Sequence, residues 1–184
     1  MLPPNYAASP TLQTPRLFLR PFLTEDLDVL ARLMANADFM RFSTGTYSRE
    51  QTATFLEKVS GWARDGLPSQ FAVIMRDTGE LFGYCGFFHQ LVDEFAEVEI
   101  GYRLHPNYWN RGLATEAARA VRDHGFRDLQ LARLISLIHV DNAASRRVAE
   151  KNRMMLEKQT LFRGFPTNIF AISRQQWLKE VHAA

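Results

Sequence analysis

A glycine-bearing turn that runs directly into a helix, at residues 108–117, constrains this chain more than any other segment. Residues 98–104 have the pattern of a strand, and His105-Pro106-Asn107 ends it because proline cannot continue a strand ladder. An apolar helical stripe then continues to Asp128. A helix start leaves backbone N–H groups without intrahelical partners, and Gly112 lets a ligand approach them closely. The order of strand, turn and helix therefore predicts a site for an anion, and a phosphate group is the expected anion.

The turn carries neither of the two common phosphate-binding signatures, G-x-G-x-x-G and G-x-x-x-x-G-K-[ST]. It does resemble the pyrophosphate-binding motif of the GNAT acetyltransferases, [QR]-x-x-G-x-[GA]. Gly112 and Ala114 occupy the last two places of that motif, and Trp109 occupies the first. Tryptophan at this place resembles the branch that acts on ribosomal-protein N-termini, in which the stretch commonly has the form Y-W-G-x-G-Y-A-T-E-A.

Further segments resemble the same branch in the same order along nearly the whole chain. They correspond to its first strand, acidic helix start, fourth strand, second cofactor motif (N-x-x-S-x-x-V-x-E-K) and closing strand, at residues 14–21, 24–26, 99–102, 141–151 and 171–177. The resemblance implies an α/β fold of the GNAT type. Such a fold has a mixed, mostly antiparallel sheet with helices on both faces and a splay between strands 4 and 5 that admits the cofactor.

Composition favours one globular domain. A chain of 184 residues with 46% hydrophobic content suits a single core, so we expect a loose tail over residues 1–12 and one domain over residues 13–184. The net charge of +2 does not suggest nucleic-acid binding. No apolar run approaches the roughly 18 residues of a membrane span, and the N-terminus lacks a secretory pattern, so we expect a cytoplasmic protein without a membrane partner.

Cysteine and histidine usage gives no support for a metal site. The single cysteine, Cys85, excludes an intrachain disulfide and a multi-cysteine zinc site, and its apolar neighbours predict a buried thiol in a strand. The five histidines are scattered along the chain without metal-ligand spacing. We therefore expect no metal.

Capping signals and periodicity predict the remaining elements. Thr24 is expected to cap one helix, Ser48–Gln51 to form a capping box for the next, and Ser173–Gln176 to form a box for a terminal helix. Strands are expected at residues 71–75, 81–88, 134–140, 155–160 and 169–173, a loop at 162–167, and a helix at 143–152 capped by Asp141 or Asn142. This series of hairpins with one strand–helix–strand crossover also predicts a mixed α/β sheet.

The resemblance implies that acetyl-CoA binds along the splay. Its diphosphate is expected on backbone N–H groups of the turn, and its pantetheine arm along the edge of the strand that ends at Leu104. Gly101 is expected to mark a bulge that opens this edge. The candidate cofactor-binding residues are Tyr102, Arg103, Leu104, Asn110, Arg111, Gly112, Leu113, Ala114, Thr115, Asn142 and Ser145.

Acyl transfer to an amine needs a group that takes the amine proton. Glu99 is the candidate base and Glu97 is its rival, because period-two alternation places both on one face of a strand. The alternative is that these carboxylates face solvent or attract a basic substrate. A backbone N–H near Gly101 or Tyr102 is expected to hold the reacting carbonyl.

The leaving thiolate needs an acid. The tyrosine that many GNAT enzymes use aligns with Ala149, so Ser145 is the candidate acid and Asn142 the candidate contact to the pantetheine or thioester region. Both residues can equally serve as helix caps. Two further departures concern conformation. Asn110 replaces a common glycine, and Arg153-Met154 replaces the usual Gly-Phe, so the turn after that helix is expected to differ.

These observations predict an acetyl-CoA-dependent N-acetyltransferase that works by direct transfer to a primary amine. The acceptor is left open between an amine-bearing small molecule and a protein N-terminus, and the oligomeric state between monomer and homodimer. Residues 39–47 and 162–167 are expected to shape the acceptor side, although Phe39, Phe42, Phe162 and Phe165 could equally be core. The alternative is a non-catalytic CoA-binding regulatory module, which Ala149 and Arg153 make plausible.

Overall fold

The computed structural model describes residues 11–183 of the protein; residues 1–10, which make up most of the expected tail, and residue 184 lie outside this range. The strands are β1 (Leu12–Gln13), β2 (Leu17–Pro21), β3 (Gln70–Met75), β4 (Leu81–Val92), β5 (Phe95–Leu104), β6 (Arg133–His139), β7 (Met155–Phe162) and β8 (Phe165–Ser173). The helices are α1 (Leu27–Met34), α2 (Arg49–Arg64), α3 (Leu113–Arg127), α4 (Ala143–Lys151) and α5 (Arg174–Ala183), with 3₁₀ turns at Thr24–Asp26 and Pro106–Tyr108.

The described strands form one sheet in the order β1-β2-β3-β4-β5-β6-β8-β7. Neighbouring strands are antiparallel except β5 and β6, which run parallel. Only Glu99 and Ile135 pair between these two strands, so the sheet opens beyond that point. The predicted mixed, mostly antiparallel sheet is confirmed. The expected splay lies between β5 and β6, because the short strand β1, which contains Leu12, shifts the strand count by one.

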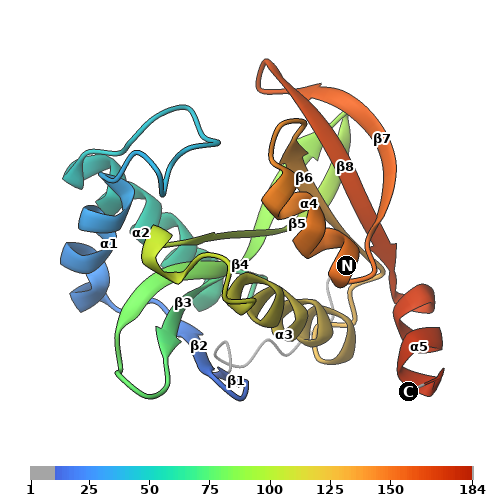
Figure 1. Cartoon of the computed structure of the whole chain (residues 1–184), viewed down its shortest axis with the longest axis horizontal. Coiled ribbons are helices and arrows are strands. Elements are labelled where there is room, and N and C mark those ends of the chain that lie inside the picture. Colours follow the sequence, from blue (N-terminus) through green and yellow to red (C-terminus); the bar gives the residue numbers. More distant parts are fainter. Residues whose placement is uncertain (1–10, 184) are drawn as a thin grey trace.

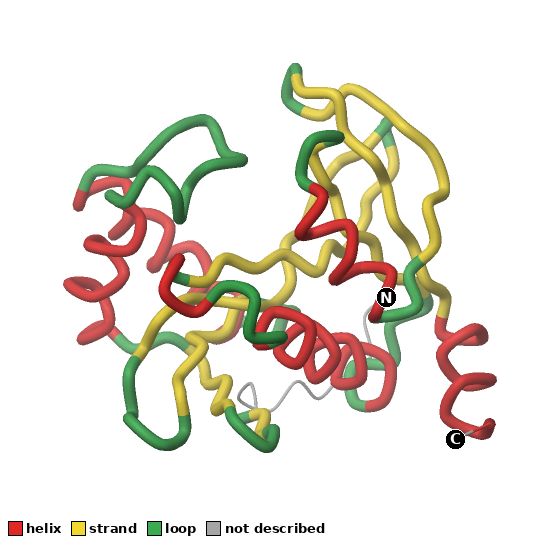
Figure 2. Tube along the Cα trace, viewed as in Figure 1, coloured by secondary structure: helices red, strands yellow, loops and turns green. Residues whose placement is uncertain are grey.

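Helices cover both faces of the sheet (Figure 1). Phe71 and Val73 of β3 belong to a core packed under α3, whereas Ala72 between them belongs to a second core packed under α1 and α2. From the helices, Val121 of α3 contributes to the first core and Val59 of α2 to the second. The helix α4 lies over the β6–β8 half and α5 follows at its lower end (Figure 2). The splay therefore lies between two supported halves of one sheet.

The expected helix starts have different outcomes. The box at Ser48–Gln51 is confirmed, since the Ser48 N–H donates to Gln51 Oε1 at 2.8 Å and the Gln51 N–H to Ser48 Oγ at 3.2 Å. Thr24 as an N-cap is wrong. Instead, the carboxylate of Asp26, which pairs with Arg20 at 2.7 Å, accepts the Leu23 N–H at 2.8 Å. The helix α1 begins at Leu27, the residue after Asp26. A carboxylate held by a guanidinium is the stronger acceptor at this helix start.

Two hairpins are longer than expected. Strands β4 and β5 meet at Asp93-Glu94, two non-glycine residues with φ of 48° and 70°. Strands β7 and β8 meet at Arg163-Gly164, with φ of 50° and 82°, so the loop expected at residues 162–167 is wrong. Both turns have positive φ at their two central residues, as tight two-residue hairpin turns require. Pro166 tolerates this position because it lies near the start of β8.

Gly101 does not mark a bulge. The pairing of β4 with β5 is regular through Gly86 and Gly101, which lie opposite each other. A Cβ at Gly101 would lie 2.7 Å from the ring of Phe88, so the glycine makes room for that ring. The opening of the sheet has another cause, which is the loss of β6 as a partner after Glu99.

Candidate functional site

The turn at residues 109–112 presents the start of α3 to solvent. Asn110 and Gly112 have φ of 57° and 77°, a conformation that asparagine and glycine tolerate better than most residues. The first intrahelical bond runs from the Glu116 N–H to the Gly112 carbonyl at 3.1 Å. The N–H groups of Leu113, Ala114 and Thr115 therefore precede the helical ladder. Together with the positive end of the helix dipole, they make this helix start favourable for an anion, as the sequence predicts.

Arg16, which precedes β2, lies beside this turn. One of its guanidinium nitrogens donates to the Arg111 carbonyl at 3.0 Å, and another lies 3.6 Å from where a Cβ would stand at Gly112. Its Nε donates to the carboxylate of Glu116 at 2.7 Å. The sequence alone does not indicate this residue, because its position next to Gly112 depends on long-range packing. The guanidinium lies beside the turn, and its charge is shared with the carboxylate of Glu116.

A basic pocket lies further along α3. It is an open pocket of about 440 Å³ lined by Arg119, Arg147, Glu150, Lys151 and Arg153. The single carboxylate among these residues is already engaged, because Glu150 lies 3.6 Å from Arg146. The pocket therefore favours an anion. Arg119 lies one helical turn beyond Thr115, the last residue of the phosphate turn, as residues 109–115 are called here.

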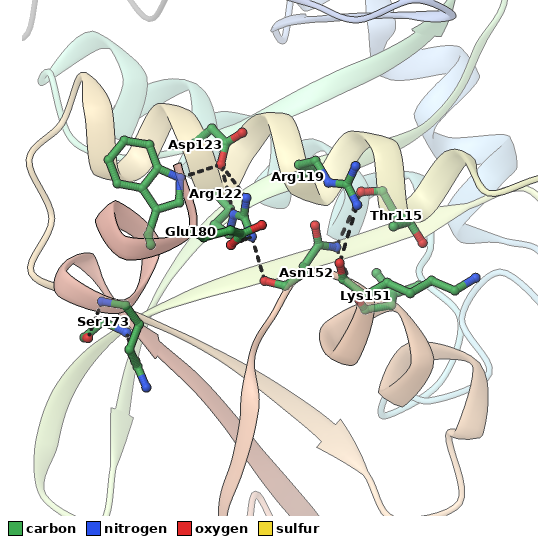
Figure 3. A network of polar contacts seen from close by, with 11 residues as sticks. Thr115, Arg119, Arg122, Asp123, Lys151, Asn152, Ser173 and Glu180 are labelled. Atoms are coloured by element: carbon green, nitrogen blue, oxygen red, sulfur yellow. Dashed lines mark hydrogen bonds and ion pairs between the residues drawn. The ribbon is translucent and has the colours of Figure 1, made fainter. Parts of the chain in front are cut away.

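Hydrogen bonds fix α3 against the end of α4 and so fix the walls of the basic pocket (Figure 3). The Asn152 amide donates to the Thr115 carbonyl at 3.4 Å, and Arg119 donates to the Lys151 carbonyl at 3.4 Å. The buried guanidinium of Arg122 donates to the Asn152 carbonyl at 2.8 Å and pairs with Glu180 of α5 at 3.1 Å. Three helices are thereby held together around one buried cation.

Arg153 keeps the left-handed conformation that glycine would supply, with φ of 61°. The turn into β7 therefore does not differ in conformation, contrary to expectation. A non-glycine residue in this region costs about 1 kcal/mol or more. The strained backbone places a guanidinium at the rim of the basic pocket, where a glycine would place nothing.

The edge of β5 faces the splay. The carbonyl of Ile100 accepts the hydroxyl of Ser136 at 2.9 Å, and the carbonyl of Leu104 accepts the indole N–H of Trp109 at 2.7 Å. The indole of Trp109 therefore binds the end of β5. It brings no charge to the turn at residues 109–112, unlike an arginine at the motif position that it occupies. Main-chain groups of alternate residues point to the same side of a strand, so the N–H of Tyr102, between these two, also points into the splay.

Glu99 lies where β5 and β6 separate. The side-chain amide of Gln90 donates to its carboxylate at 2.6 Å. Burial raises the pKa of Glu99, while hydrogen bonds from Gln90 and the Leu137 backbone and the charges of Arg163 and Arg103 lower it. The net direction is upward, which suits a group that accepts a proton near neutral pH.

Glu97 is engaged in an ion pair. Its carboxylate accepts from Nε of Arg133 at 3.2 Å, and Arg133 also pairs with Glu157 at 2.7 Å. This network joins β5, β6 and β7 away from the splay. Of the two carboxylates that the sequence left open, Glu99 belongs to the residue at which β5 and β6 separate, and Glu97 is paired with Arg133.

The start of α4 closes the other side of the splay. Asn142 caps the helix, because its Oδ1 accepts the Ser145 N–H at 3.0 Å, and Asp141 does not serve as the cap. The hydroxyl of Tyr102 donates to the Ser145 carbonyl at 3.3 Å, which ties β5 to α4. Burial is the largest cause that raises the pKa of Tyr102, so its hydroxyl stays protonated. Ala149 is buried in the core beneath the helix.

Aromatic side chains form a wall across the opening. The ring of His139 on β6 lies 5.6 Å from that of Phe42 and 6.2 Å from that of Phe165. Phe39 lies in one hydrophobic core and Phe162 packs against another. Of the four aromatic residues that the sequence left open, two are therefore core residues, and Phe42 and Phe165 lie beside His139. Arg103, expected at the cofactor, donates to the carbonyls of Phe39 at 3.1 Å and Phe42 at 3.4 Å and so holds the loop between α1 and α2 (Figure 2).

Cys85 is buried, as expected, and burial raises the pKa of its thiol. Within residues 11–183, no group of three or more His, Cys, Asp and Glu side chains is placed to hold a metal ion. Over the same range, no helix has the length and apolarity needed to cross a membrane.

The structure thus has an open parallel strand pair, a helix start with N–H groups that precede the helical ladder, and a carboxylate where the strands separate. Residues 16–155 match the family model described as Acetyltransferase (GNAT) domain. The uncharacterized N-acetyltransferase p20 of Bacillus licheniformis is 30% identical over 157 residues, which cover 84% of this chain and 86% of that protein.

Solved structures agree with the sequence comparison. An acetyltransferase from Agrobacterium tumefaciens strain C58 has a TM-score of 0.77 and 29% identity, covering 91% of this chain and 96% of that one. RimL, a ribosomal L7/L12 alpha-N-protein acetyltransferase in complex with coenzyme A, has a TM-score of 0.77 and 19% identity, covering 91% and 99%, and shares the fold. The chain belongs to the GNAT acetyltransferase family and is an N-acetyltransferase.

Proposed function

We propose that the protein transfers the acetyl group of acetyl-CoA directly to a primary amine, with Glu99 as the base and Ser145 as the acid. The acceptor amine belongs to a small molecule or to a protein N-terminus. RimL, whose fold the chain shares, is a ribosomal-protein N-terminal acetyltransferase in complex with coenzyme A, which supports this cofactor and this class of acceptor.

The charges around α3 support binding of acetyl-CoA. Its diphosphate meets the N–H groups of Leu113, Ala114 and Thr115, with Arg16 beside them and Asn110 and Arg111 lining the turn. The basic pocket offers further cations for the rest of the anionic end. The pantetheine amides pair with the edge of β5 from Tyr102 to Leu104, as a peptide adds to a sheet, and Asn142 borders their path.

Transfer then requires three proton movements. The carboxylate of Glu99 takes a proton from the ammonium, directly or through a water, and the amine lone pair forms the N–C bond at the acetyl carbonyl carbon. The N–H of Tyr102 holds the carbonyl oxygen as negative charge develops on it. As the C–S bond breaks, the Ser145 hydroxyl gives a proton to the thiolate, and the second proton that the nitrogen loses on becoming an amide restores the hydroxyl, directly or through a water. No covalent intermediate with the enzyme forms.

One observation supports this proposal above the others: Glu99 is the residue of β5 that pairs with β6 where the two strands separate, and its carboxylate is held there by Gln90. The acceptor approaches past Phe42, His139 and Phe165. An amine entering there meets a carboxylate with a raised pKa, whereas Glu97 is neutralised by Arg133.

The test measures thiol release from acetyl-CoA with a panel of amines, amino acids and peptides. The Glu99→Gln enzyme should lose roughly 10²–10⁴-fold in rate, because the amide keeps the shape but takes no proton. The loss should shrink as pH rises, since an amine with a pKa near roughly 10 increasingly arrives neutral. Glu97→Gln is the matched control. A pH-dependent loss in Glu97→Gln alone would exchange the two roles, and binding of acetyl-CoA without release for any amine would favour a regulatory module.

A further inference from the structure

We infer that Gln90 is a positioning residue for Glu99, and that Arg163 at the tip of the β7–β8 hairpin fixes the orientation of the Gln90 amide. This inference rests on the proposed role of Glu99 as the base. The three residues come from β4, β5 and the turn between β7 and β8, so their meeting is a product of the tertiary fold.

The amide of Gln90 bridges the other two side chains. Its Nε2 donates to Glu99 Oε2 at 2.6 Å, and its Oε1 accepts from the guanidinium of Arg163 at 3.3 Å. An ionised carboxylate only accepts and a guanidinium only donates, so a single orientation of the amide satisfies both partners. Reversing the amide would set its oxygen against the carboxylate and its N–H groups against the guanidinium. Arg163 therefore selects the orientation in which Gln90 holds Glu99.

The hairpin that carries Arg163 is fixed against β4 and β5. Lys158 pairs with Asp93 at 2.8 Å and Thr160 donates to the same carboxylate at 2.9 Å, which anchors β7 to the β4–β5 turn. Arg163 itself has φ of 50°, and its guanidinium lies 5.0 Å from the ring centre of Phe162. A strained backbone position is retained where surrounding contacts over-determine it, as they do here.

Gln90 holds one oxygen of the Glu99 carboxylate, which also has a hydrogen bond from the Leu137 backbone. Such a contact restricts rotation of the carboxylate and stabilises its charged form. Losing the contact leaves burial as the dominant influence, so the pKa of Glu99 rises further. Losing Arg163 removes a positive charge and the constraint on the amide, with a smaller effect because the side chain is exposed to solvent.

Other charged and titratable groups near Glu99 stay constant in this comparison. Arg103 on the same strand lowers its pKa, and the phenols of Tyr84 on β4 and Tyr102 on β5 interact with it electrostatically. On β6, Arg133 is paired with Glu97, and His139 follows Leu137 on the same face. These groups keep their contacts when residue 90 or 163 is changed.

Carbon-detected NMR titration of the glutamate carboxyls tests the inference without relying on activity. The Glu99→Gln protein identifies the Glu99 resonance. The Gln90→Met protein keeps the side-chain length but has no N–H, and we expect the pKa of Glu99 to rise by about half a unit or more. Arg163→Met should raise it by less. Lys179→Met, which neutralises an exposed cation on α5 and leaves the β7–β8 hairpin unchanged, is the control and should leave the pKa of Glu99 unchanged.

Kinetics supplies the second readout. Gln90→Met should reduce turnover by about tenfold on the high-pH plateau with little change in the KM for the amine, because a mobile base is misplaced in the transition state. If the pKa of Glu99 is the same as in the parent in both Gln90→Met and Arg163→Met, the inferred coupling from Arg163 through Gln90 to Glu99 is wrong. The proposed role of Glu99 as the base is not affected by that result. Full activity in Glu99→Gln overturns the proposed base itself, whatever the titration shows. If Gln90→Met does not fold, the pKa of Glu99 in Arg163→Met tests the inference, because Arg163 is exposed.

Discussion

The carboxylate of Glu116 and the guanidinium of Arg16 lie 2.6 Å apart, although 100 residues separate them in the chain. Glu116 also accepts the hydroxyl of Thr14 at 2.7 Å. The pair joins the segment before β2 to the first turn of α3, directly beneath the N–H groups of the phosphate turn. The geometry of the anion site thus depends on a contact made by the first described part of the chain.

This pair makes stability depend on pH. Burial alone would raise the pKa of Glu116, but hydrogen bonds from Thr14 and Arg16 outweigh it and lower the pKa. A depressed carboxylate pKa contributes stability above the unfolded value of about 4.3, and the contribution is lost as pH falls through the folded value. Glu116→Gln should therefore cost about 1–2 kcal/mol at pH 7 and progressively less below about pH 4. Urea denaturation across this range measures the difference, and a deficit that is constant with pH would contradict it.

Gly112→Glu should abolish acetyl-CoA binding. The glycine has φ of 77°, so any side chain there is strained by about 1 kcal/mol or more, although a Cβ would meet only Arg16 at 3.6 Å. A carboxylate at this position repels the diphosphate and competes for Arg16. Calorimetry compares it with Gly112→Ala, which adds the Cβ alone and should weaken binding less. If Gly112→Glu binds acetyl-CoA with an affinity within a factor of two of the parent, the cofactor does not bind at this turn.

Arg153→Gly should change stability and affinity in opposite directions. Relief of the left-handed conformation at φ 61° should stabilise the fold by about 0.5–1 kcal/mol. Loss of one cation from the basic pocket should weaken acetyl-CoA binding several-fold, and more so at low ionic strength. Thermal unfolding and calorimetry together measure both effects. Arg146→Gly, at an exposed position within α4, is a control that should destabilise.

Ser145→Ala should lower turnover by roughly 10²-fold while barely changing the affinity for acetyl-CoA, since a leaving-group acid acts in the transition state. The cap of α4 uses the Ser145 N–H rather than its hydroxyl, so the alanine variant keeps the cap. Single-turnover kinetics isolates the chemical step. An unchanged rate there would reduce Ser145 to a capping role, and a matching rise in the dissociation constant would identify it as a binding residue.

Local signals in the sequence predicted what local chemistry decides. The Ser48 box, the Asn142 cap and the positive φ of Asn110 depend on residues a few positions apart, and the structure has all three. The splay and the phosphate turn were recognised through the family resemblance and the glycine-bearing helix start. The Asp93-Glu94 turn was missed because its second residue, Glu94, is not one that favours positive φ, although Asp93 tolerates it.

Side-chain partners far apart in sequence were beyond prediction. Nothing in the sequence couples Gln90 to Glu99 or Glu97 to Arg133, because period-two alternation places both glutamates on one face and register decides which partner each meets. Arg103 was expected at the cofactor, yet its side chain turns to the loop between α1 and α2. The resemblance located the strand edge but could not say where each side chain of that strand points.

The way Arg103 holds that loop bears on how new acceptor preferences arise. Its guanidinium donates hydrogen bonds to the main-chain oxygens of Phe39 and Phe42, and every amino acid supplies such an oxygen. Arg41 and Phe42 are exposed, so substitutions there alter the lining of the entrance while the anchor persists. If the proposed function holds, single replacements at these two positions would change the lining that an acceptor meets, while the contacts that hold the loop and the proposed cofactor residues on α3 and β5 stay the same.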